Sequence, residues 1–370
     1  MNETKSVRYH RLKRRSAVAS VAITAVLLAV VLATGFSSFI ADAARRFAHS
    51  PDSPSSPLAV GLYVAILALL QETLTFPLSW YQGLALERRY GLSLERFGGW
   101  LRDHLKAVAL GFILSVAAAE GVYLALRLAP TWWWLFSAIA FVLATAGLAS
   151  IAPVVLLPMF YRFTPLERES LRNRLVSLST RAGVPVLGVY EWALGEKSRR
   201  ANAALVGTGA TRRILVSDTL LAEYSDDEIE VILAHEIGHH VHHDILVGFV
   251  AESVLLVVAF YAAAIALHTW GPRLGLERAA DVAGLPLLLL VGGAVSVLAT
   301  PFVNALSRWN ERRADRYALT LTGHAGPFIS AMRRLGNQNL AEEQPSTISL
   351  WLFHSHPPIE QRIEAARAFL

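Results

Sequence analysis

Residues 225–243, SDDEIEVILAHEIGHHVHH, hold the side chains best suited to chemistry, because His235, Glu236 and His239 form the pattern H-E-x-x-H. On a helix, residues four apart share one face and lie about 6 Å apart along the axis. Two neutral imidazoles at that spacing can bind one side of a Zn²⁺ ion. Glu236 beside them can take a proton from the attacking water. The alternative is an amphipathic helix that exposes a histidine-rich face.

A helix is expected over these residues for local reasons. Ser225 and Glu228 form a capping box, which predicts the helix start. The apolar residues that would bury one side of the helix are Ile229, Val231, Ile232, Leu233 and Ile237. The other histidines of this region and of the C-terminal segment are predicted not to bind metal: His240, His242, His243 and His354.

A catalytic zinc ion needs a third protein ligand and one open position. The chain contains no cysteine, so histidine and carboxylate must supply every ligand. The segment SRWNERRADRYA offers Glu311, and Asp315 follows four residues later on the same helical face. Asp315 would accept a hydrogen bond from a ligand imidazole and fix its tautomer. The alternative for Glu311 is an ion pair with a neighbouring arginine in a solvated run of charges.

The composition is that of an integral membrane protein. Hydrophobic residues make up 54% of the chain and charged residues 17%, below the roughly 25% of soluble domains. The net charge is +5, but the basic residues cluster near the ends of apolar runs. That pattern indicates membrane topology and gives no reason to expect a nucleic-acid partner.

Six apolar runs are long enough to span a bilayer, which takes about 20 helical residues. They cover residues 17–40, 58–81, 105–128, about 131–161, 245–268 and 285–306. The first run could be a signal peptide, since residues 41–43 resemble a cleavage site, but its length favours a retained span. Glu72 in the second run would face either a protein interior or the solvated interface.

These runs divide the chain into an N-terminal membrane region, 1–161, with four spans, and a metallopeptidase domain, 162–370, with two more. Short strands are predicted at 186–192, 203–206 and 213–217. With six spans, the basic segments 1–15, 82–104, 162–213 and 307–370 all lie on one side. The positive-inside rule places that side, with both termini and the candidate site, in the cytoplasm.

The motifs together resemble one known family. HEIGHH, then S-R-x-x-E-x-x-A-D after two spans, then HSHPP, is similar to the type I CAAX prenyl proteases, which are integral-membrane zinc endopeptidases. The resemblance covers nearly the whole chain after about residue 57 and includes SRRANAALVG and HPPIEQRI. It implies one zinc ion per chain, bound by His235, His239 and Glu311, with Glu236 as the base.

The resemblance also implies further site residues. Asn202 and Ala203 would lie on a strand along which an extended substrate pairs. His356 would stabilise the oxyanion, and Arg362 would lie near the substrate or the zinc-site carboxylates. Without the resemblance, Asn202 would be a turn residue and Arg362 a surface charge on a helix.

The expected fold is mostly α: a polytopic membrane protein with six spans around an intramembrane chamber and a zincin-like cytosolic catalytic domain containing a small β-sheet. Eukaryotic family members have seven spans, so one N-terminal span would be missing. The expected partners are the bilayer and a peptide or protein substrate, lipidated and membrane-inserted chains included. The expected location is the cell membrane, or the endoplasmic reticulum membrane in a eukaryotic source.

Two alternatives to a CAAX-type protease stay open at this point. One is a zinc protease for quality control of membrane proteins. The other is a non-hydrolytic zinc-binding membrane scaffold or transporter, supported by Glu72 and Glu120 within spans.

Overall fold

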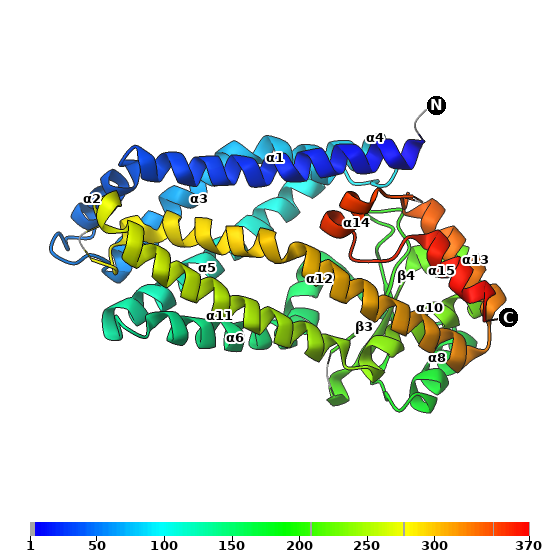
Figure 1. Ribbon diagram of the computed structural model, residues 1–370. Helices are drawn as coiled ribbons and strands as arrows, with labels where there is room; N and C mark the ends of the chain where they lie inside the picture. Colours follow the sequence, from blue (N-terminus) through cyan, green and yellow to red (C-terminus); the bar gives the residue numbers. More distant parts are fainter. Residues whose placement is uncertain (1–3, 208, 277, 343, 370) are drawn as a thin grey trace.

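The computed structural model describes residues 4–207, 209–276, 278–342 and 344–369. Within these residues six helical stretches are long and apolar enough to cross a bilayer, which confirms the predicted number. They run along the length of the molecule; the sheet and the C-terminal helices gather at one end of this bundle, whereas residues 36–47 lie at the other (Figure 1). The helices that form them are α1 (Lys5–Ala33), α3 (Pro57–Trp80), α5 (Phe97–Leu128), α6 (Trp133–Ile151), α11 (Asp244–Trp270) and α12 (Leu285–Thr322).

The predicted first span, 17–40, was wrong at both ends. The helix α1 begins at Lys5, so the basic residues that precede the apolar run are helical too. It ends before Gly35, whose φ of 71° lies in the left-handed region that favours glycine. A separate amphipathic helix, α2 (Phe36–Phe47), follows and includes the last residues of the predicted span, and it buries Ile40, Ala41 and Ala44.

Two of the spans contain a π-helical turn near a proline. The helix α3 runs on through a π-helical turn, η1 (Tyr81–Ala85), into α4 (Leu86–Arg89). In the same way α6 continues through η2 (Ala152–Leu156) into α7 (Leu157–Phe160). Pro77 lies just before the first π-helical turn and Pro153 within the second. Proline lacks the N–H of a regular helix, yet neither proline ends its span, and each lies near a π-helical turn.

Glu72 is paired inside the bundle. Its Oε1 lies 2.7 Å from Nε2 of His104 on α5, and the ring of His104 stacks on that of Trp100. Of the two predicted environments for Glu72, this contact favours the one inside the protein.

A four-stranded sheet lies in the C-terminal half, with strand order β1-β2-β4-β3. The strands β2 and β4 are parallel, and the other two pairings are antiparallel. The strands are β1 (Phe163–Pro165), β2 (Gly188–Trp192), β3 (Ala203–Val206) and β4 (Arg213–Ser217). The predicted strands 203–206 and 213–217 are confirmed, whereas β1 was missed. β3 forms one edge of the sheet.

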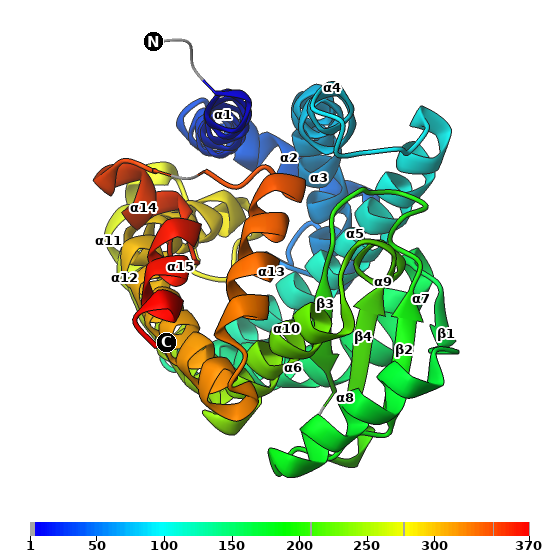
Figure 2. The same cartoon turned by 90° about the vertical axis from the view of Figure 1, so that its right-hand side faces the viewer.

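The helix α10 (Asp226–Val241) packs between this sheet and the C-terminal helices (Figure 2). The predicted capping box is present, since Ser225 Oγ accepts from the Glu228 N–H and the Glu228 side chain accepts from the Ser225 N–H. The remaining helices are α8 (Glu169–Arg181), α9 (Asp218–Glu223), η3 (Gly209–Thr211), η4 (Pro272–Leu274), η5 (Val282–Gly284), α13 (Ala325–Gln338), α14 (Thr347–Phe353) and α15 (Ile359–Arg367).

Two features of the long helices position the site. The backbone turns between α10 and α11 at His243, whose φ is 57°, so the histidine helix and the fifth span are separate elements. In contrast, α12 continues without a break from the sixth span to Thr322. Glu311 and Asp315 therefore lie on the same helix as that span.

Candidate metal centre

The site forms where α10 crosses α12. Gly238 faces Ala314 at this crossing, and a Cβ added to Gly238 would lie 3.1 Å from the Cα of Ala314. That is too close for most side chains to fit without a shift of the helices. Glycine at 238 therefore permits the short distance that lets a carboxylate on α12 reach the imidazoles on α10.

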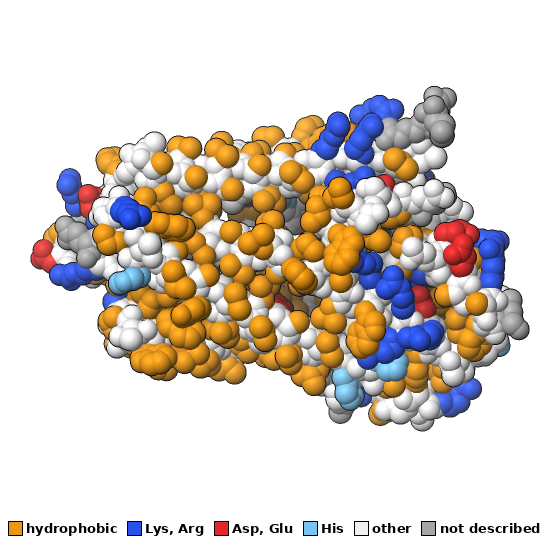
Figure 3. Space-filling view, viewed as in Figure 1, with side chains coloured by type: hydrophobic (Ala, Val, Ile, Leu, Met, Phe, Trp, Pro, Cys, Tyr) orange, Lys and Arg blue, Asp and Glu red, His pale blue; other side chains and the backbone are white. Residues whose placement is uncertain are grey.

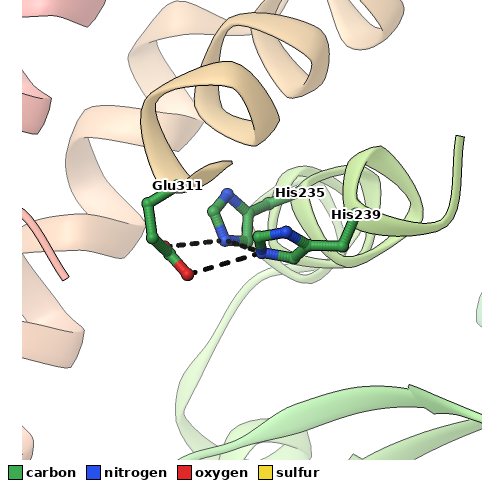
Figure 4. A group of neighbouring side chains, drawn as sticks. All are labelled: His235, His239 and Glu311. Carbon is green, nitrogen blue, oxygen red and sulfur yellow. Dashed lines mark hydrogen bonds and ion pairs between the residues drawn. The ribbon is translucent and has the colours of Figure 1, made fainter. Parts of the chain in front are cut away.

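Three potential metal donors converge at this crossing (Figure 4). The Nε2 atoms of His235 and His239 are 3.2 Å apart. The Glu311 carboxylate places Oε2 at 3.3 Å from His235 Nε2 and Oε1 at 3.4 Å from His239 Nε2. One atom from each residue lies within 4.8 Å of the other two.

A carboxylate faces the outer nitrogen of each imidazole. His235 Nδ1 lies 2.9 Å from Asp315 Oδ1, and His239 Nδ1 lies 2.8 Å from Asp244 Oδ2. Each Nδ1 can thus donate its proton outward, which directs the lone pair of each Nε2 toward the centre. Arginines in turn bind these carboxylates: Arg362 donates to Asp315 at 2.8 and 2.6 Å, and Arg313 donates to Asp244.

The donor set fits a divalent cation. Glu311 is buried, and its Oε2 has no hydrogen-bond partner. Two imidazole lone pairs and a carboxylate repel one another unless a positive charge lies between them. Two histidines and one glutamate are also a donor set typical of catalytic zinc.

A proton can occupy the same place as the metal. Burial alone would lower the pKa of His235, but the nearby carboxylates of Asp315 and Glu311 outweigh it and raise the pKa to about 10. Metal ligands bind in their deprotonated form, so a metal ion must displace this proton.

Glu236 follows His235 on α10 and is half-buried. Burial raises the pKa of its carboxyl above the usual range, although the imidazoles of His235 and His239 act in the opposite direction. A carboxyl with a raised pKa is better matched to exchanging protons near neutral pH than an ordinary glutamate.

The C-terminal segment brings two further residues to the site. His356 Nε2 lies 3.2 Å from Glu311 Oε1, and 62% of the His356 side chain is exposed. Arg362 Nη2 lies 3.4 Å from His235 Nδ1 and 3.8 Å from Glu311 Oε2. His356 therefore faces the open side of the donor group, whereas Arg362 supports it from within.

The edge strand β3 runs beside α10. Ala203 begins β3, and Asn202 directly precedes it, where its carbonyl accepts from the Ser217 N–H at 2.9 Å. Hydrogen-bonding direction alternates along a strand, so the backbone groups of Ala203 and Leu205 point away from β4. His240 Nε2 lies 3.0 Å from the Leu205 carbonyl oxygen on that outer edge.

The histidines predicted not to be ligands lie outside the donor group. His240 contacts β3, and the ring of His242 packs on that of Tyr317. His243 Nδ1 lies 3.2 Å from the His240 carbonyl oxygen, and His354 lies 3.3 Å from Glu342. The described residues contain one other group of possible donors, Asp227, Glu230 and His324, but Arg174 binds both of its carboxylates.

Sequence reasoning missed Asp244 and Arg313. A usable signal existed, because each ligand imidazole needs an acceptor for its second N–H. Asp315 supplies one acceptor, and Asp244, five residues after His239, supplies the other.

Replacing Asp244 with asparagine should weaken metal binding by about 10–100-fold, the usual effect of losing such an outer partner. Metal content after titration with a chelator measures this. The matched control is Asp42→Asn on α2, whose side chain is 55% exposed and bonds Arg45. Metal retention equal to that of the control would show that Asp244 does not orient His239.

The fold and site together define a membrane-embedded metallopeptidase of the H-E-x-x-H type. The chain belongs to peptidase family M48, whose family model matches residues 165–370. The model for the CAAX prenyl protease N-terminal region, described as five membrane helices, matches residues 2–162. Four of the six candidate spans lie in that matched region.

Individual relatives agree with this assignment. Metalloprotease YhfN from Bacillus subtilis is 30% identical over 309 residues, which cover 82% of this chain and 72% of the relative. CAAX prenyl protease 1 from Saccharomyces cerevisiae is 27% identical and covers 82% of this chain and 71% of its own length. The crystal structure of S. mikatae Ste24p shares the fold, with a TM-score of 0.83 and 23% identity over 98% of this chain and 87% of that one.

Proposed function

We propose that this metallopeptidase binds one zinc ion through His235, His239 and Glu311 and cleaves peptide bonds in membrane-associated protein substrates. The observation that carries the proposal is the meeting of these three donors from two helices, with Glu236 next to them. When bound, the ion would supply Lewis acidity and lower the pKa of water toward neutrality.

The residues around the donors have separate roles in this proposal. Glu236 takes a proton from the attacking water and returns it to the leaving amine. His356, on the open side, donates a hydrogen bond to the developing oxyanion. Asp315 and Asp244 fix the imidazole tautomers, and Arg362 positions Asp315.

The substrate would pair with the outer edge of β3. Ala203 presents both backbone groups on this edge, which suits an extended peptide that adds as a further strand. The Leu205 carbonyl is taken by His240, so the pairing would centre on Ala203. Asn202 is exposed next to this edge and would contact the same peptide.

The site would face the cytoplasm, because the basic segments of the chain lie on its side of the spans. We also propose two regions, a membrane region (1–161) and a metallopeptidase domain (162–370). The non-hydrolytic alternative loses support, because the chain belongs to a peptidase family and Glu72 pairs with His104.

The proposed substrate class is a protein with a lipidated or strongly apolar end, in line with relatives named CAAX prenyl proteases. Purified protein in zinc-containing proteoliposomes would be offered a farnesylated peptide with a CAAX end, the same peptide without farnesyl, and an unfolded membrane protein. We expect the farnesylated peptide to be cleaved at least about tenfold faster than its unmodified form, because its apolar tail is buried on binding.

A chelator added to the same reaction is the control and should stop all cleavage. Preferential cleavage of the unfolded membrane protein would favour the quality-control alternative. The absence of cleavage of any of the three substrates by zinc-loaded protein would contradict the endopeptidase proposal.

A further inference from the structure

The short helix α14, Thr347–Phe353, lies outside the six spans yet exposes an apolar face. Ile348 is 73% exposed, Trp351 44% and Leu352 38%. These positions are i, i+3 and i+4, so they share one side of the helix. On the other side Ser349 is buried, and its Oγ contacts His354 Nε2 at 3.2 Å. Exposing such an apolar face to water is unfavourable.

We propose that α14 rests in the interfacial layer of the bilayer, with its apolar face against lipid. Its attachment to α12 sets its depth. Asn304 Nδ2 donates to the Trp351 carbonyl at 3.0 Å, and Arg308 Nη1 donates to the Leu350 carbonyl at 2.9 Å. The helix α12 begins at Leu285. At 1.5 Å per residue it has risen about 30 Å at Asn304, which is the thickness of the hydrocarbon core.

The surroundings of α14 are those of a membrane interface. Phe302 and Val303 directly precede Asn304 on α12, and their side chains are 74% and 49% exposed. The apolar face of α14 therefore continues the lipid-facing surface of the sixth span. Figure 3 shows hydrophobic side chains over this region and basic side chains at the nearby end of α1. Trp351 lies at the level where tryptophan is enriched in membrane proteins.

The basic end of α1 lies beside the same segment. The rings of His10 and His354 are 6.3 Å apart, and Arg14 on α1 forms an ion pair with Glu342. The α1 residues around them carry several further cations, including Arg8, Arg11 and Arg15. Such residues favour the level of anionic lipid headgroups. A bilayer therefore fits both the apolar face of α14 and the charge next to it.

A short segment of the chain connects α14 to the metal site, so lipid contact at α14 would affect the site. Arg308 is buried, and its Nη1 binds the His354 carbonyl at 2.7 Å as well as the Leu350 carbonyl. The chain then passes directly from His354 to His356, which lies 3.2 Å from Glu311. The bilayer would thus help to hold the His356 segment in place. This last step, unlike the lipid contact, rests on the proposed role of His356.

The lack of native cysteine allows a direct test of the lipid contact. Ile348→Cys, labelled with an environment-sensitive fluorophore, would be placed in vesicles of phosphatidylcholine and phosphatidylglycerol. Doxyl groups near the headgroup or deep in the acyl chain would serve as quenchers. The matched sites are Phe302→Cys on the span and Glu360→Cys on α15, both exposed. This readout requires no enzymatic activity, so it does not depend on the proposed function.

We expect the label at 348 to lose fluorescence with the shallow quencher and less with the deep one. The label at 302 should respond to both, and the label at 360 to neither. A label at 348 that behaves like the one at 360 and is quenched by aqueous iodide would overturn the proposal. Self-quenching that rises with the protein-to-lipid ratio would assign the face to a second copy of the chain. Protection only after substrate is added would assign it to the substrate. Leu352→Cys repeats the measurement at a second site on the same face.

Discussion

Glu236→Gln is expected to lower kcat for peptide cleavage by about 10²–10⁴-fold, the usual contribution of a general acid–base group. Glutamine has nearly the same shape as glutamate but cannot accept a proton from water. Glu236 is not one of the three converging donors, so zinc content should stay at the wild-type value. Cleavage kinetics and elemental analysis of the same preparation measure the two effects separately.

The control for this variant is Glu223→Gln, an exposed residue at the end of α9. It should keep both activity and zinc. If Glu236→Gln cleaves at the wild-type rate, another group must be the base. If the variant loses zinc together with activity, Glu236 supports the metal rather than the proton transfer.

Glu311→Gln is expected to remove the metal as well as the activity. It replaces the only negative charge among the three donors by a neutral amide, which is a poor zinc ligand. The loss of affinity should exceed the roughly 10–100-fold expected for an outer partner such as Asp244. A metal that binds only the folded state also stabilises it, by about 2.7 kcal/mol at a concentration 100 times the Kd.

Two measurements check this prediction: zinc content, and thermal unfolding with and without a chelator. The chelator should lower the Tm of the wild-type protein and leave the Tm of Glu311→Gln almost unchanged. Glu364→Gln, at an exposed position on α15, is the matched control and should respond to the chelator like wild type. A Glu311→Gln protein with full zinc content would exclude Glu311 from the ligand set.

Elements with strong local signals were predictable from the sequence. The capping box at Ser225 and Glu228 begins α10, and the four-residue spacing of His235 and His239 puts both imidazoles on one face. The strands β3 and β4 occur at the predicted residues. The signal for such a strand, an apolar run bounded by turn residues, is local in the sequence. The number of spans follows from apolar length alone.

Elements without such signals were misjudged. The uncharged, mostly apolar run extends on both sides of Gly35, so hydropathy does not reveal the break between α1 and α2. The strand β1 has three residues, and its pairing with β2 alone defines it. The sixth apolar run ends at 306, and hydropathy gives no sign that one helix continues from it to Thr322, where packing on α10 stabilises the polar part of α12.

The sequence by itself determined which side chains can do chemistry here, because metal-ligand types, helical spacing and apolar length are local properties of the chain. Tertiary structure decided how they meet. The close crossing at Gly238 and Ala314 brings Glu311 to the imidazoles, and the turn at His243 brings Asp244 back to His239. The first contact depends on how distant segments pack, which no spacing within a single segment encodes. The second joins residues only five apart, but it depends on the left-handed backbone turn at His243.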